Sequence, residues 1–292
     1  MGAGVSSIMG PEGEVGAEGA DTGLGDLPES CVAAVLLRLE PREICDAARL
    51  SRAFRGAAAA DFVWEAKLPE NHGYLMSFVS EGAERGKGFV CKKEIYARLC
   101  RPIRFDGGNK EFWMEKRRSG ICMAISSKGL AITGVDDRRY WNHISTEESR
   151  FGSVAYLMQT WWFEAAGEVD FCFPAGKYSL YFRLHLGRAY RRLGRRLCNS
   201  EHVHGWEKKP VQFQLSTADG QHARTHCHLA EPGAWILYHV GDFIVPNSSV
   251  PTKLKFSMTQ IDCTHTKGGL CVDSAVIYPK GFRQGKAYTA CM

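Results

Sequence analysis

The start of the sequence contains few large apolar side chains that could form a core. Residues 1–30 contain six acidic residues and no lysine or arginine, and residues 1–23 are rich in glycine and glutamate. This composition predicts a disordered tail. The rest of the chain is therefore more basic than the net charge of +5 suggests. A mild excess of this kind does not predict nucleic-acid binding, which requires a concentrated basic face with base-reading or stacking groups.

Other absences narrow the class of protein. No apolar signal-peptide core follows Met1, no apolar run is long enough for a transmembrane segment, and the eleven cysteines include no C-x-x-C pair. We therefore expect free thiols and a location in the cytoplasm, the nucleus or both. No Gly-rich phosphate loop, nucleophile elbow or His-Glu-x-x-His helix is present. The sequence thus predicts no catalytic residue, no cofactor and no enzymatic activity.

Two clusters suggest metal ligands without completing a site. His226 and His228 would share one face of a strand, and Cys263 stands close to His265 and Cys271. Neither cluster is followed by a second ligand pair at a recognised spacing. We predict no metal site.

The first residues, "MGAGVSS", fit the Met-Gly-x-x-x-Ser pattern for N-myristoylation of Gly2. One acyl chain gives only marginal, reversible membrane attachment, and the acidic residues that follow supply no polybasic second signal. Modification of Gly2 would therefore allow transient membrane association and no stable anchoring.

The stretch "DLPESCVAAVLLRLEPREICDAARLSRAFR" predicts short helices. Val32, Val35, Leu36 and Leu39 recur at helical spacing and form one apolar stripe. Pro41 ends that helix and begins a second, and an Ala-rich third helix is predicted over residues 52–68. Such a unit is too small to be stable alone. Its apolar face could pack on the rest of the chain or against another protein, and periodicity alone favours the first.

Residues 27–69 resemble an F-box. The matching features are the Leu-Pro entry, the Pro-x-x-Ile-Cys second helix, the Ser-Arg-x-Phe-Arg turn and the closing Val-Trp. The resemblance implies an adaptor unit that docks on the Skp-type subunit of a cullin–RING ubiquitin ligase. The residues predicted for the docking face or its immediate support are Leu27, Pro28, Leu36, Leu39, Ile44, Cys45, Leu50 and Trp64.

From about Phe105 the apolar residues alternate with polar ones. In "KYSLYFRLHL" the residues Tyr178, Leu180, Phe182, Leu184 and Leu186 share one face. "VQFQLS" and "KLKFSM" alternate in the same way, and further candidate strands are "ICMAIS", "LAIT", "SVAYLMQTWWFEA", "ARTHCHL", "AWILYHV" and "GLCVDSAVIYP". Many short strands between turn residues predict an antiparallel sandwich or barrel.

This half resembles the phloem protein 2 domain, a plant lectin-like β-sandwich related to the tobacco agglutinin. The resemblance rests on "FWMEKRRSGICMAISSKGLAIT", "DDRRYW", "ESRFGSVAYL", "HVHGWEKKPVQFQLSTADGQ" and "IDCTHTKGGLCVDSAVIYPKG". The predicted fold class is α+β and multidomain, with a three-helix F-box before an antiparallel, jelly-roll-like β-sandwich. The predicted segments are a tail (1–23), the F-box (24–69), a helical connector (70–104), the sandwich (105–280) and a C-terminal tail (281–292).

Lectins of this family are thought to hold N-acetylglucosamine glycans through aromatic residues near "IT…YW". Trp141 matches one family tryptophan, whereas Gly134 and His143 stand where two others occur. The resemblance therefore implies weak or no binding of chito-oligosaccharides, with Trp141 as the main contact. A role for Trp141 in bracing its own loop is equally consistent with the sequence. The residues predicted around such a sugar site are Trp141, Tyr140, Asp136, Asp137 and Arg139.

Together these features predict the substrate-recognition subunit of a Skp–cullin–F-box ubiquitin ligase. Its partners would be the Skp-type adaptor, the cullin–RING ligase and an unidentified target protein or glycoprotein. The alternative is a free-standing cytoplasmic or nuclear lectin with a helical appendage. For two further stretches the sequence favours a structural interpretation. The basic run "GRAYRRLGRRL" is predicted to be an exposed loop. The residues Trp161-Trp162-Phe163 are predicted to lie on a strand with at least one face in the core.

Overall fold

The computed structural model describes residues 27–80, 91–117, 119–192, 195–282 and 288–289. The chain divides into two compact units, residues 1–60 and residues 61–292. The predicted N-terminal tail, with Gly2, lies outside the described residues. Within the described ranges, no helix is long and apolar enough to cross a membrane.

The first unit contains three short helices, α1 (Glu29–Leu36), α2 (Pro41–Ala47) and α3 (Arg52–Ala57). Local hydrogen bonds fix where they begin. At α2, the Glu40 backbone N–H donates to the Glu43 carboxylate over 2.7 Å as part of a capping box. At α3, the Phe54 N–H donates to the Ser51 hydroxyl over 3.3 Å. Such caps satisfy backbone donors that the first helical turn leaves unpaired.

The third predicted helix, residues 52–68, is interrupted. α3 ends at Ala57, the chain turns, and α4 (Asp61–Glu65) begins in the second unit. The Lys92 backbone N–H donates to the Asp61 carboxylate over 2.8 Å, and the Trp64 ring lies 5.1 Å from that of Tyr96. Tertiary contacts of α4 therefore outweigh the helix propensity of the alanine run, and the prediction of one continuous helix is wrong.

The helices α4, α5 (His72–Ser80) and α6 (Lys92–Leu99) are part of the second unit. On α5, the Phe78 ring lies 5.5 Å from Phe112 and 5.7 Å from Phe171. The Asn71 amide donates to the Cys172 carbonyl over 2.7 Å. The segment predicted as a helical connector is thus packed into the same body as the strands.

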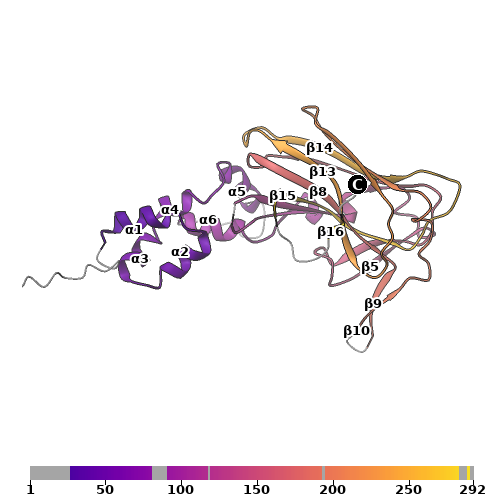
Figure 1. Ribbon diagram of the computed structural model, residues 1–292, viewed down its shortest axis with the longest axis horizontal. Helices are drawn as coiled ribbons and strands as arrows, with labels where there is room; N and C mark the ends of the chain where they lie inside the picture. Colours follow the sequence, from indigo (N-terminus) through magenta and orange to yellow (C-terminus); the bar gives the residue numbers. More distant parts are fainter. Residues whose placement is uncertain (1–26, 81–90, 118, 193–194, 283–287, 290–292) are drawn as a thin grey trace, which may run out of the picture. The chain divides into compact units, whose positions relative to one another are not determined.

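The strands form two main sheets and a hairpin. Their bounds are β1 (Ile103–Phe105), β2 (Lys110–Met114), β3 (Ile121–Ser126), β4 (Ala131–Ile132), β5 (Trp141–Ser145), β6 (Ser153–Leu157), β7 (Phe163–Phe171), β8 (Gly176–Leu186), β9 (Arg188–Arg192), β10 (Arg195–Asn199), β11 (Val211–Thr217), β12 (His222–Cys227), β13 (Trp235–Val245), β14 (Thr252–Gln260), β15 (Leu270–Pro279) and β16 (Tyr288–Thr289). The larger sheet has the order β1-β2-β3-β15-β8-β13-β16, with β6 beside β15 and β5 beside β6. Figure 1 labels β5, β8, β13, β15 and β16 of this sheet. The smaller sheet has the order β12-β11-β14-β7-β4.

The two sheets pack face to face. Phe182 of the larger sheet lies 6.1 Å from Phe213 and 5.7 Å from Phe256 of the smaller sheet. All three rings are buried, and large aromatic groups of this kind dominate core energetics. The second unit is therefore a mostly antiparallel β-sandwich with helices, and β13 with β16 is a parallel pair.

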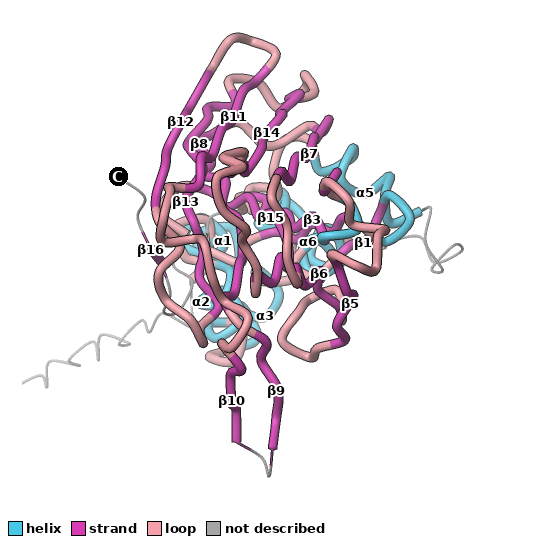
Figure 2. The backbone as a smooth tube through the Cα atoms, turned by 90° about the vertical axis from the view of Figure 1, so that its right-hand side faces the viewer, coloured by secondary structure: helices cyan, strands magenta, loops and turns pink. Residues whose placement is uncertain are grey.

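The alternating pattern predicted the inner faces correctly. Every second residue of β8 from Tyr178 to Leu186 is buried, as are the apolar members of "VQFQLS" and "KLKFSM". Two other segments differ from their predictions. "SVAYLMQTWWFEA" is two strands, β6 and β7, separated by residues 158–162. The basic run forms the hairpin β9–β10 (Figure 2), where the sequence predicts a loop.

Asp242 on β13 makes polar contacts with three side chains. The Lys280 ammonium lies 2.6 Å from its carboxylate, the Ser179 hydroxyl donates over 2.7 Å, and His239 Nε2 lies 2.9 Å away. Burial by itself would raise the pKa of Asp242. The hydrogen bonds from Lys280, Ser179 and His239 outweigh burial and lower this pKa from 3.8 to about 2.

We expect this cluster to make the sandwich sensitive to acid. A carboxyl group with a depressed folded-state pKa stabilises the fold fully above its unfolded pKa of 3.8, and this contribution is lost as the pH falls through about 2. Asp242→Asn should therefore flatten the loss of unfolding free energy across this window, as measured by urea unfolding at several pH values. Asp170→Asn is the control, because the contact of Asp170 with Lys253 is long, at 3.8 Å, and both side chains are exposed. Equal slopes for Asp242→Asn and wild type would contradict the prediction.

Candidate functional site

The candidate docking surface of the first unit consists of exposed apolar side chains. Leu27 is 37% exposed, Val35 48% and Leu50 73%. Pro28 and Cys45 are also exposed. Exposed groups of this size on a small helical unit are available to a protein partner. The sequence assigns Val35 to the same stripe as Leu36, and its exposure was not anticipated.

Three of the predicted docking residues are interior. Leu36 and Ile44 are 0% exposed and Trp64 is 2% exposed. Leu39 is half-buried. Because α1 packs against α3, the unit's own core takes part of the apolar stripe. Leu36 and Ile44 can therefore support a docking surface but cannot themselves contact a partner. Trp64 lies in the second unit, where its ring is close to that of Tyr96.

Trp141, the predicted sugar contact, is a core residue. It is 2% exposed, its indole N–H donates to the Thr133 carbonyl over 3.1 Å, and its ring lies 6.3 Å from Phe163. A sugar ring cannot stack on an indole without an exposed face. The prediction of Trp141 as the main sugar contact is therefore wrong, and the residue braces the loop that begins at Thr133.

Two of the polar residues predicted for that site form an ion pair with each other. Arg139 makes a 2.6 Å ion pair with Asp137, and its guanidinium lies 5.5 Å from the centre of the Tyr140 ring. The hydrogen bonds from Arg139 lower the pKa of Asp137. Asp136 and Tyr140 are exposed. Because Trp141 is buried, it gives these residues no exposed aromatic face on which a sugar ring could stack.

Substitution of Trp141 should therefore affect stability. We expect Trp141→Ala to lower the free energy of unfolding by about 3–5 kcal/mol, because it leaves a cavity beside Phe163 and removes the bond to Thr133. Tyr140→Ala is the control, because Tyr140 is 41% exposed and should change stability by about 0.5 kcal/mol or less. Urea unfolding measures both. A Trp141→Ala protein as stable as Tyr140→Ala would show that Trp141 does not brace the fold.

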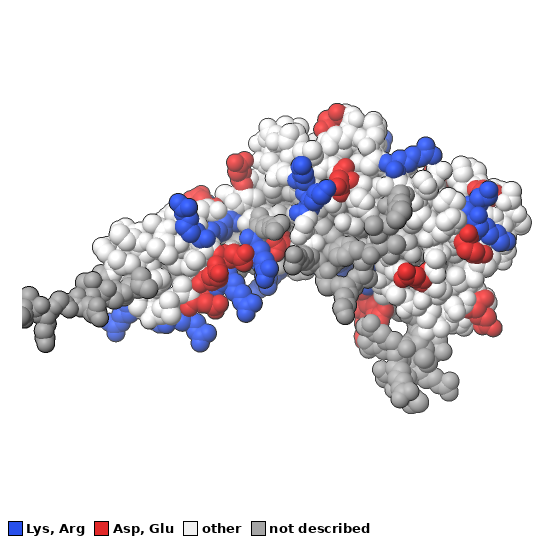
Figure 3. Space-filling model, viewed as in Figure 1, with Lys and Arg blue, Asp and Glu red and all other residues white. Residues whose placement is uncertain are grey.

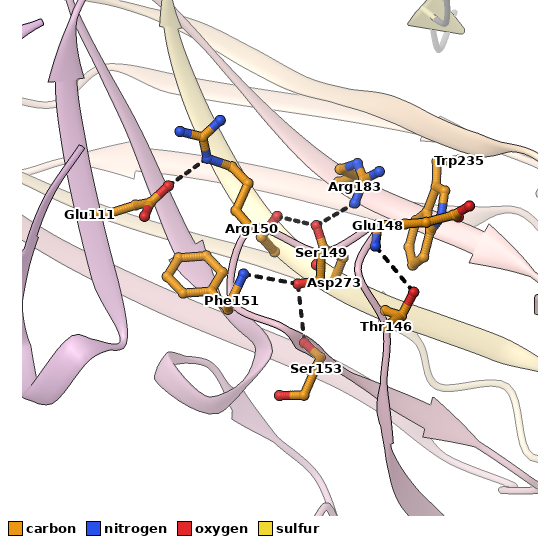
Figure 4. A network of polar contacts seen from close by, with 11 residues as sticks. Glu111, Thr146, Glu148, Ser149, Arg150, Phe151, Ser153, Arg183, Trp235 and Asp273 are labelled. Atoms are coloured by element: carbon orange, nitrogen blue, oxygen red, sulfur yellow. Dashed lines mark hydrogen bonds and ion pairs between the residues drawn. The ribbon is translucent and has the colours of Figure 1, made fainter. Parts of the chain in front are cut away.

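Residues 146–153, which include the motif "ESRFGS", form a strap that crosses the outer face of the larger sheet (Figure 4). Arg150 pairs with buried Glu111 and lies over the Trp113 ring at 3.9 Å. Glu148 accepts a 2.7 Å hydrogen bond from the indole N–H of Trp235. These contacts tie residues 146–153 to strands that are distant in sequence. This face of the sandwich is therefore partly covered by the chain itself.

A buried ion pair stands beside the strap. Arg183 on β8 donates to Asp273 on β15 over 2.8 Å, where a register shift interrupts the pairing of these strands. Asp273 is fully buried, and the Arg183 guanidinium lies 4.3 Å from the Trp235 ring. Removing one member of such a pair leaves the other charge uncompensated in the interior. The pair therefore has a structural role in this face.

The exposed tryptophans of the described sandwich are Trp161 and Trp162, at 54% and 45%. Of the run Trp161-Trp162-Phe163, only Phe163 enters the core. Nearby, Lys267 is 0% exposed and donates to the carbonyls of Trp161 and Asp262 over 2.7 and 2.9 Å. Burial lowers the pKa of Lys267, although Cys263 and Asp262 oppose this effect. A buried ammonium thus fixes the loop that exposes the two tryptophans, an arrangement that alternation alone could not reveal.

The remaining candidate groups do not converge on a site. His226 and His228 are exposed, and the described residues contain no group of three or more His, Cys, Asp or Glu placed to hold a metal ion. On the face of the sandwich drawn in Figure 3, acidic and basic side chains are interspersed.

Comparison with known proteins covers both halves of the chain. Residues 120–279 match the family model described as Phloem protein 2. The Arabidopsis thaliana proteins F-box protein PP2-A13 and F-box protein PP2-A12 are each 57% identical over 258 residues, which is 88% of this chain and 88% of theirs. F-box protein PP2-A15 of the same plant is 54% identical over 89% of both chains.

Among solved structures, a family 35 carbohydrate-binding module from Clostridium thermocellum aligns with 54% of this chain and 98% of its own. The TM-score is 0.33 at 9% identity. A likeness this low carries no argument about function.

Proposed function

The chain belongs to the plant F-box proteins that carry a phloem protein 2 domain, and from this membership we propose that it is the substrate-recognition subunit of a Skp–cullin–F-box ubiquitin ligase. The N-terminal helices dock on a Skp-type adaptor. The β-sandwich binds a target protein or glycoprotein. The chain itself is a non-catalytic receptor of the cytoplasm, the nucleus or both.

The observation that supports adaptor docking is the exposure of Leu27, Val35 and Leu50 on a unit whose other described large apolar groups are buried or half-buried. Full burial of one such side chain contributes about 1.5–3 kcal/mol. A few anchors of this kind can dominate the binding free energy of an interface. The unit thus has a core of its own and apolar groups left for a partner.

The sandwich suits the receptor role for a different reason. Its core fixes strands from both sheets, while loops and outer faces remain available for recognition. The alternative, a free-standing lectin, has the same sandwich but does not need the exposed apolar groups of the helical unit. Adaptor binding therefore separates the two functions.

We expect Leu27→Ala with Pro28→Ala, and separately Val35→Ala with Leu50→Ala, each to weaken adaptor binding by about tenfold or more, because each pair loses apolar area that the complex buries. Titration of the full chain with a purified plant Skp-type adaptor measures the affinity. Ile244→Ala is the matched control, because Ile244 is 49% exposed on β13 of the sandwich.

Circular dichroism should show that all three variants retain their helices and strands. Unchanged adaptor affinity in both double variants would contradict docking through this surface. No measurable adaptor binding by the wild-type chain would favour the free-standing lectin.

A further inference from the structure

Two arginines share one buried carboxylate where the larger sheet ends at β1. Arg104 on β1 stands opposite Glu111 on β2 in the antiparallel register, so both side chains project from the same face. The Arg104 Nε lies 3.5 Å from one carboxylate oxygen of Glu111, and the Arg150 Nε of the strap binds the other oxygen. The Glu111 side chain is 3% exposed, whereas those of Arg104 and Arg150 are 56% and 37% exposed. One buried anion therefore holds two solvent-facing cations.

Aromatic rings and a carbonyl group hold both guanidinium groups in place. The Arg150 Cζ lies 3.9 Å from the centre of the Trp113 ring, and the Arg104 Cζ lies 5.9 Å from the centre of the Phe151 ring. Arg104 Nη2 also donates to the Arg150 carbonyl over 2.9 Å. These cation–π contacts and this hydrogen bond restrict the rotamers that a long arginine side chain would otherwise sample. The two groups are thus ordered before any ligand binds.

The terminal nitrogens of the two arginines are available to a ligand. A guanidinium has five N–H donors, and Glu111 accepts from the Arg150 Nε alone of that group. Among the described residues, no hydrogen bond is made by Arg104 Nη1 or by the two terminal nitrogens of Arg150, which Figure 4 shows directed away from Glu111. Glu111 also compensates only one of the two positive charges. The pair therefore offers several N–H donors together with one uncompensated positive charge.

The number and charge of these donors select the ligand. A phosphate monoester carries a charge of about −1.5 to −2 at pH 7 and three strong acceptor oxygens, so it can accept from both guanidinium groups. A carboxylate has two oxygens and one charge, which a single guanidinium satisfies. An apolar ligand would leave the N–H donors unpaired. Nucleic acid would require a longer row of cations, and the neighbouring Lys110 is already paired with Asp106 at 3.0 Å.

We propose that Arg104 and Arg150 bind a phosphorylated serine or tyrosine side chain of a target protein. The phosphate oxygens accept from the terminal N–H groups, while Glu111 and the two aromatic rings keep those groups in position. This inference rests on the proposed receptor function and deepens it, because it makes recognition of the target depend on modification of the target. The sandwich then engages its target only after a phosphoryl group has been added.

The test is surface plasmon resonance of the full chain on four immobilised pools of random nonapeptides. The central residue of the pools is phosphoserine, phosphotyrosine, glutamate or serine. We expect at least one phosphopeptide pool to bind about tenfold more tightly than the glutamate pool, because phosphate has the additional charge and acceptor oxygen. The serine pool should show no measurable binding, and inorganic phosphate should compete with the phosphopeptides.

Arg104→Gln removes one half of the pair but leaves Glu111 its bond to Arg150, and we expect it to weaken phosphopeptide binding about tenfold. Arg104→Lys keeps the charge without the planar fork and should also bind more weakly than wild type. Arg224→Gln is the matched control, because Arg224 is an exposed arginine of the smaller sheet that donates to Gln212 over 2.8 Å. It should leave the affinity unchanged. Urea unfolding of each variant checks that it is folded.

Three results would overturn the inference. They are equal binding of the phosphopeptide and serine pools, equal binding of the phosphopeptide and glutamate pools, and phosphopeptide binding that Arg104→Gln weakens no more than Arg224→Gln. The third result, with a lower free energy of unfolding for Arg104→Gln, would assign Arg104 a structural role alone. The adaptor titration is run on the same proteins. Loss of phosphopeptide binding with intact adaptor binding leaves the proposed ligase role standing, whereas phosphopeptide binding without adaptor binding leaves the site standing and removes the ligase role.

Discussion

The contact of Phe182 with Phe213 and Phe256 is the constraint on which the sandwich depends. It fixes which side of every central strand is inner and which is outer, since side chains alternate along a strand. A second aromatic contact joins Phe171 of β7 to Phe78 of α5. The helices α4 to α6 and the two sheets therefore belong to one unit, and only residues outside its core are free to vary for recognition.

The outer faces of the two sheets differ in how far the chain itself covers them. The larger sheet is partly covered by the strap that Arg150 and Glu148 hold down. Among the described residues, no such covering lies over the outer face of the smaller sheet, where Gln214, Ser257 and Ala166 line a groove. One outer face is therefore partly covered by contacts within the chain, whereas the other has polar side chains at its surface. This asymmetry is a stronger guide to recognition than the sandwich architecture, which is compatible with many functions.

The sequence predicted those features that follow from local period. Alternation around Phe182 and Phe213 was enough to assign strands and inner faces. The helical period around Leu36 predicted a helix, but could not tell core from docking surface, because that depends on where α3 packs. The burial of Trp141 depends on the distant Phe163 and on the Thr133 carbonyl. The exposure of Trp161 depends on Lys267, about a hundred residues further along the chain. Such assignments require the three-dimensional fold.

The union of α4–α6 with the strands has a consequence for synthesis. Asn71 and Cys172 are 101 positions apart in the chain, and a ribosome adds about 5–20 residues each second. Asn71 and the adjoining helix α5 therefore leave the ribosome several seconds before the strand residues that hold them. Until β7 has been made, α5 lacks Phe171, against which Phe78 is packed. This part of the chain consequently completes its packing only after more than half of the protein has been synthesised.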